Sequence, residues 1–91
     1  MANTRSAEKR ARQAEKRRQR NRAIRSTVRT AVKKVRKALE QNDVQAAQEL
    51  LRAATRTIDK AHSKGVLKAN TARRKISRLA RAVAAKAAGS Q

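Results

Sequence analysis

The chain contains no proline, and its only two glycines stand at positions 65 and 89. Proline interrupts a helix because it lacks an amide hydrogen and clashes with the preceding turn, so its absence allows long helices. Ala, Arg, Lys, Gln, Leu and Glu dominate the sequence, and these residues favour the helix. We therefore expect an all-α fold with two internal breaks, at residues 41–43 and near Gly65.

Three helices are predicted, over residues 6–41, 44–63 and 68–88. Asn42 and Gly65 suit the left-handed backbone that ends a helix. Asp43 is a good N-cap for the second helix, and Asn70 is the best N-cap for the third by residue type. The short first link makes the first two helices an antiparallel hairpin, and a three-helix bundle follows.

The predicted core is thin, because the chain has no Phe, Tyr, Trp or Cys and must rely on aliphatic side chains. Large aliphatic residues recur every three or four positions in the second half of the first helix, from Ile24 to Leu39. Towards the N-terminus, only Ala7, Ala11 and Ala14 take up this spacing. We expect that half of the helix to project from the bundle, and Val66 and Leu67 to close the end of the core.

Positive charge is concentrated at both ends of the chain, which carries a net charge of +20. Residues 1–40 hold fifteen Lys and Arg against three Glu, and residues 68–88 hold seven without an acid. Residues 41–67 are nearly balanced, so the second helix is expected to be the scaffold. Like charges at this density repel one another in the compact state, whereas a phosphate backbone removes the repulsion and releases counterions. The sequence therefore predicts a nucleic-acid-binding protein.

Several other functions are excluded by composition. Without cysteine there is neither a disulfide nor a thiolate zinc site, and one histidine, His62, is expected to be solvated or to cap a helix. Glu8 and Glu15 are expected to offset Arg12 and Arg18 rather than to form a catalytic pair. No nucleophile with a base and no phosphate-binding glycine loop is found, so we expect no enzyme, cofactor, metal or small-molecule substrate.

Membrane functions are also disfavoured. No apolar run approaches the roughly 20 residues of a membrane span, and the N-terminus lacks the apolar region of a secretory signal. A membrane-active cationic peptide fits poorly, because the basic half of the first helix has no large apolar face. We expect an intracellular soluble protein.

The remaining mode of nucleic-acid binding is recognition of phosphates and of shape by Arg and Lys. Readers that stack bases on aromatic rings are excluded, because the chain has no aromatic residue. Polar side chains for sugar or base edges are available at Gln13, Gln19, Asn21 and Asn70. Both a folded RNA and duplex DNA suit this surface, so composition leaves open a histone-like protein that compacts DNA.

Two separated runs of residues resemble a known family. The first run comprises Ser6-Ala7-Glu8-Lys9-Arg10, Gln13, Glu15-Lys16-Arg17-Arg18 and Asn21, continued by Arg29-Thr30 and Lys33-Lys34-Val35. The second comprises Lys64-Gly65-Val66-Leu67, Asn70, Ala72-Arg73 and Lys75. In their order and spacing, these runs resemble bacterial small-subunit ribosomal protein family number twenty, over nearly the whole chain. Two departures are Asn42 in place of glycine and Lys68-Ala69-Asn70 in place of His-Lys-Asn.

The resemblance implies a single domain, residues 1–91, that binds small-subunit ribosomal RNA and stabilises its fold during assembly in the cytoplasmic ribosome. It implies a monomer within the particle, with neighbouring ribosomal proteins as further partners. The implied RNA contacts are Ser6, Lys9, Arg10, Gln13, Lys16, Arg17, Arg18, Asn21, Lys64, Lys68, Asn70, Arg73, Arg74 and Lys75. To these predicted RNA contacts we add five cations from the basic surfaces of the first and third helices: Arg25, Arg29, Lys33, Lys34 and Arg78.

Overall fold

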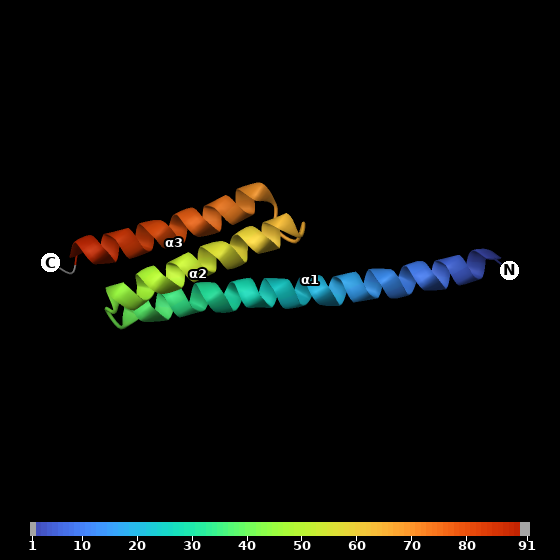
Figure 1. The fold of residues 1–91 in the computed structure, drawn as a ribbon, viewed down its shortest axis with the longest axis horizontal. Helices are drawn as coiled ribbons and strands as arrows, with labels where there is room; N and C mark the ends of the chain where they lie inside the picture. Colours follow the sequence, from blue (N-terminus) through green and yellow to red (C-terminus); the bar gives the residue numbers. More distant parts are fainter. Residues whose placement is uncertain (1, 90–91) are drawn as a thin grey trace.

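The computed structural model describes residues 2–89, with side chains from Thr4 onward. It contains three helices, α1 (Ala2–Glu40), α2 (Val44–Ser63) and α3 (Ala69–Gly89), and no strand among the described residues. α2 runs back along the second half of α1, and α3 packs on α2, as Figure 1 shows. The predicted all-α bundle is confirmed. α1 begins earlier than residue 6, α2 has its expected range, and α3 is displaced by one residue.

The turn between α1 and α2 is held by backbone hydrogen bonds and a side-chain cap. Asn42 has a φ of 58°, and its amide donates to the carbonyl oxygen of Leu39 at 3.1 Å. The amide of Asp43 donates to Ala38 at 3.0 Å, which completes a Schellman motif. The Asp43 carboxylate then accepts from the amide of Ala46 at 3.1 Å. The predicted left-handed stop and the predicted N-cap are both confirmed.

α2 ends with the same kind of helix-terminating turn, here with glycine in the left-handed position. Gly65 has a φ of 77° and donates to His62 at 2.9 Å, and Val66 donates to Ala61 at 3.0 Å. Nδ1 of His62 lies 2.9 Å from the carbonyl oxygen of Leu67, so the ring N–H donates there. Val66 is buried and Leu67 is half-buried, as expected for residues that close the core.

α3 begins within one residue of its predicted start, but Asn70 does not cap it. The carbonyl of Lys68 accepts the first helical hydrogen bond, from Ala72 at 2.9 Å, so Lys68 precedes the helix and Asn70 lies inside it. The predicted N-cap at Asn70 is therefore wrong. A helix boundary is defined only to within one or two residues, so the preference of one residue type does not fix it.

The core lies where all three helices run side by side. Its largest fully buried side chains are Ile58, Leu79 and Val35, one from each helix. Ala47 and Ala54 of α2 are 0% exposed, so this helix meets its neighbours through small side chains that allow close approach. No polar or charged residue described in the structure is buried. The bundle is thus held by a short aliphatic core, centred on α2.

The first half of α1 stands outside this core. Every residue from 4 to 20 is exposed, and the molecule measures 71 × 22 × 14 Å. Its radius of gyration is 18.1 Å, whereas a compact chain of this length has about 12 Å. The predicted projection is confirmed. Val28 and Ile24 mark the side of α1 that faces the core. Continued towards the N-terminus in steps of three and four residues, this side includes Asn21, Arg17 and Gln13. Polar residues, rather than the expected alanines, therefore occupy the centre of this side in the projecting half.

Candidate nucleic-acid interface

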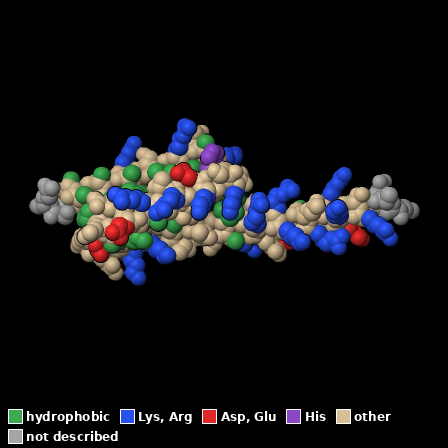
Figure 2. All heavy atoms as spheres, viewed as in Figure 1, with side chains coloured by type: hydrophobic (Ala, Val, Ile, Leu, Met, Phe, Trp, Pro, Cys, Tyr) green, Lys and Arg blue, Asp and Glu red, His purple; other side chains and the backbone are tan. Residues whose placement is uncertain are grey.

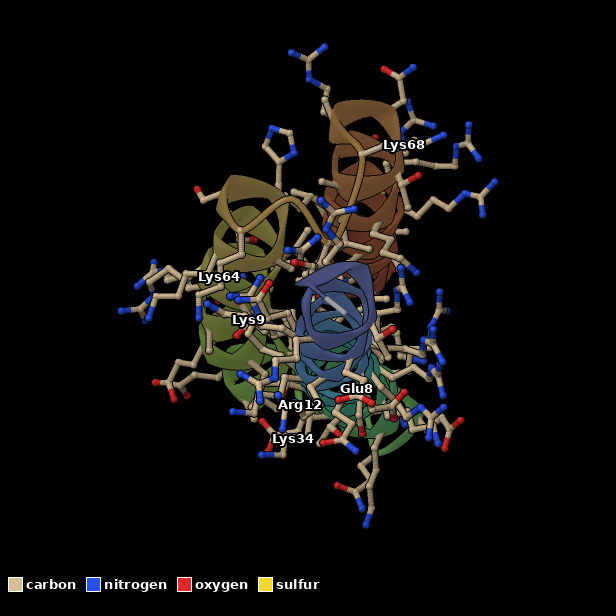
Figure 3. All side chains as sticks on the ribbon, turned by 90° about the vertical axis from the view of Figure 1, so that its right-hand side faces the viewer. Glu8, Lys9, Arg12, Lys34, Lys64 and Lys68 are labelled. Atoms are coloured by element: carbon tan, nitrogen blue, oxygen red, sulfur yellow. The ribbon has the colours of Figure 1, made fainter. Side chains whose placement is uncertain are left out.

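The cations of α1 gather into rows along the helix. Residues three or four apart lie on the same side of a helix, and the first such set is Arg5, Lys9, Arg12, Lys16 and Arg20, here called row A. All five side chains are exposed, and at about 1.5 Å per residue they extend over roughly 22 Å. In Figure 3, Lys9 and Arg12 lie on the same side of the molecule as Lys34, and Glu8, four residues before Arg12, lies next to Arg12.

A second row occupies the opposite side of α1. Row B consists of Arg18, Arg22, Arg25, Arg29, Lys33 and Arg36, all exposed and again spaced by three or four residues. At 3.6 residues per turn, rows A and B lie about half a turn apart. Row A therefore lies on the projecting half, while row B extends along the bundle on the other side of the helix.

Row B meets α3 at a small crevice. Arg25 and Arg29 line it from α1, Lys75 lines it from α3, and Val28 and Leu67 form its apolar part. The crevice measures about 120 Å³. Three cations from two helices converge here without an acidic side chain among the lining residues, which favours binding of an anion such as a phosphate.

The outer side of α3 carries its own cations. Arg74, Arg78 and Arg81 are exposed and spaced by three or four residues, whereas Leu79 and Val83 are buried. No acidic residue occurs in α3. Figure 2 shows Lys and Arg side chains distributed along the molecule, with few acidic groups between them. Basic surface is thus present on both sides of α1 and on the outside of α3.

A groove separates α1 from α2 on the side of row A. It joins two hollows that share Thr27 and Thr57, one of about 310 Å³ and one of about 250 Å³. Lys34 lines one end, and Lys60 and Lys64 line the other. We call this the α1–α2 groove; the rest of its lining is Ile24, Ser26, Thr30, Ala31, Leu50, Ala53, Ala54 and Ala61.

Acidic side chains neutralise little of this charge. Within residues 4–89 the one ion pair joins Arg18 to Glu15 at 3.2 Å, with side chains 69% and 53% exposed. An exposed pair of this kind contributes about 0–1 kcal/mol. Gln19 also donates to Glu15, at 3.4 Å. The expected Glu15–Arg18 pair is confirmed, but no pair forms between Glu8 and Arg12 in the structure. The remaining cations are available to a polyanion.

The structure distributes the predicted contacts over several surfaces. Lys9 and Lys16 belong to row A, while Arg18, Arg25, Arg29 and Lys33 belong to row B. The core-facing side of α1 continues beyond the bundle through five further predicted contacts: Ser6, Arg10, Gln13, Arg17 and Asn21. Lys34 and Lys64 line the α1–α2 groove. Lys68 lies at the start of α3 (Figure 3), and Asn70, Arg73, Arg74, Lys75 and Arg78 lie within it.

All of these side chains are exposed except Asn21 and Lys75, which are half-buried. Oδ1 of Asn21 is buried without a hydrogen-bond partner. The prediction omitted cations that lie in the same rows as the chosen ones. Spacing by three and four residues would have added them: Arg5, Arg12, Arg20, Arg22, Arg36 and Arg81.

Metal ligands and membrane-spanning helices are the two further features to consider in the described part of the chain. Among residues 2–89, no group of three or more His, Cys, Asp or Glu side chains is placed to hold a metal ion. In the same part of the chain, no helix has both the length and the apolar character needed to cross a membrane.

Comparison with known proteins places the chain in one family. Residues 2–84 match the family described as "Ribosomal protein S20". The small ribosomal subunit protein bS20 of Anaeromyxobacter sp. (strain Fw109-5) is 58% identical over 88 residues, covering 97% of this chain and 98% of that protein. The protein of the same name from Anaeromyxobacter sp. (strain K) is 57% identical over the full length of both chains. That of Carboxydothermus hydrogenoformans is 54% identical over 81 residues, 89% of this chain and 87% of its own. The chain therefore belongs to the ribosomal protein S20 family.

Proposed function

We propose that this protein is a structural, non-enzymatic constituent of the small ribosomal subunit and that it binds small-subunit ribosomal RNA directly. Its family and the names of its relatives support this role. The observation that carries the RNA-binding part is the placement of rows A and B on opposite sides of one helix, nearly without acidic partners. The whole chain acts as one RNA-binding unit, as a monomer beside neighbouring ribosomal proteins.

The mechanism is electrostatic cross-bracing. Two RNA segments brought close together repel each other through their phosphates, and a rod with cations on both sides lowers that repulsion. Row A binds one segment along the projecting half of α1. Row B, the crevice at Lys75 and the outer side of α3 bind others. Arg and Lys contacts to phosphate position the protein, so the protein stabilises an RNA fold rather than reading a sequence.

Binding measured over a series of salt concentrations tests this function. Neutralising on the order of ten phosphates gives a slope of roughly −7 to −9 in log K against log salt concentration. We expect this slope with small-subunit ribosomal RNA, and we expect binding to survive an excess of duplex DNA. A slope shallower than about −3 contradicts the mechanism, because too few phosphates would be neutralised. Equal competition by DNA would favour compaction of DNA instead.

A further inference from the structure

Three of the four hydroxyl groups that line the α1–α2 groove have hydrogen atoms that are already used, and the fourth belongs to Ser26. Thr27, Thr30 and Thr57 each donate to the carbonyl oxygen four residues earlier in their own helix, all at 3.0 Å. A hydroxyl group has one hydrogen to donate and two lone pairs that accept. Each of these three threonines therefore offers the groove an acceptor and no donor.

A surface that offers only hydrogen-bond acceptors does not bind a phosphate group. Phosphate oxygens only accept hydrogen bonds, so they gain nothing from these three hydroxyl groups. The RNA backbone has one group that donates, the 2′-hydroxyl of the ribose, and DNA lacks it. The floor of the groove includes Ala31 and Ala54, whose short side chains leave room for a sugar to approach. The groove is thus complementary to ribose.

The ends of the groove supply the donors that phosphates need. Lys34 lines one end, and Lys60 and Lys64 line the other. Row A leads towards the same place, because Thr27 lies on its side of α1, two turns beyond Arg20. Figure 3 shows Lys34 on the side of α1 that carries Lys9, with Lys64 at the end of α2, just after its last residue. A strand that follows row A therefore continues into the groove.

We propose that the α1–α2 groove binds ribose and distinguishes RNA from DNA. Thr27, Thr30 and Thr57 accept hydrogen bonds from 2′-hydroxyl groups, while Lys34 and Lys64 bind the flanking phosphates. The inference rests on the proposed function, because it requires an RNA strand along row A. It adds selectivity that positive charge does not provide, since phosphates are the same in both polymers.

The test compares three polymers and two variants. The ligand is a fragment of small-subunit ribosomal RNA that the protein protects from cleavage, together with its 2′-deoxy and 2′-O-methyl copies. The groove variant is Thr27→Val, Thr30→Val and Thr57→Val combined, which keeps side-chain shape and removes the acceptors. The matched control is Thr55→Val, because Thr55 is half-buried and donates to Leu51 at 2.9 Å but does not line the groove.

We expect the wild-type protein to bind RNA about tenfold or more tightly than either modified copy. The groove variant should lose about tenfold for RNA and remain unchanged for the modified copies, while Thr55→Val behaves as wild type. Equal affinity of the wild-type protein for RNA and 2′-O-methyl RNA overturns the inference without any variant. If the groove variant keeps the full preference for RNA, the groove proposal also fails, while tight binding that resists DNA leaves the proposed function intact.

Discussion

At the scale of single residues, Asn42 carries the backbone cost of the hairpin turn. Its φ of 58° lies in the left-handed region, where an ordinary L-residue is destabilised by about 1–2 kcal/mol. Asn tolerates this conformation, and Gly adopts it without cost. We expect Asn42→Ala to be less stable than Asn42→Gly by about 1 kcal/mol in free energy of unfolding, measured by urea denaturation. Gln41→Ala, at the exposed preceding position, is the control. Equal stability of the Ala and Gly variants would contradict this account.

Residues that act on their nearest neighbours were the ones that could be predicted from sequence. Asp43 caps α2 through an amide three residues away, and Gly65 ends it through its own backbone. Such contacts depend on a few adjacent positions, so the residue type indicates them. Asn70 lies inside α3 instead of capping it, because residue type alone locates a helix start only to within one or two residues.

At the scale of elements, α1 consists of two halves with different sources of stability. Residues 4–20 are exposed throughout, so no tertiary contact stabilises that half, and its like charges repel. We expect residues 6–22 to exchange their amide hydrogens rapidly in the free protein and slowly when RNA is bound. Residues 44–63 should be protected in both states and serve as the control. Strong protection of residues 6–22 without RNA would show that the projecting half folds by itself.

The parts of the candidate interface that lie on a single helix could be predicted from the sequence. The parts that need two helices side by side could not. Row A follows from spacing alone, although the family resemblance selected individual positions and so passed over Arg12 and Arg20. The acceptor groove requires Thr27 of α1 to lie beside Thr57 of α2. This register results from packing of Val35 and Ile58 into a shared core, and no local pattern in the sequence specifies it.

At the scale of the whole molecule, charge and stability are separated in space. Replacing Lys9, Arg12 and Lys16 of row A with Gln should make the salt slope shallower by roughly 2–3, because three phosphate contacts are lost. The midpoint of urea unfolding should stay the same or rise, because the core is untouched and repulsion decreases. A double variant of α2, Arg52→Gln and Arg56→Gln, is the control and should change the slope less. Loss of folding in the row A variant would refute this separation.

The exposed arm of α1 also affects how long each copy of the protein survives. Proteases cleave segments that open locally, and residues 4–20 offer a Lys or Arg at nearly every turn of an unpacked helix. RNA that covers the arm shields its peptide bonds from proteases, whereas a copy without RNA stays open to cleavage. We therefore expect surplus copies to be degraded first, so that the amount of the protein follows the amount of its RNA.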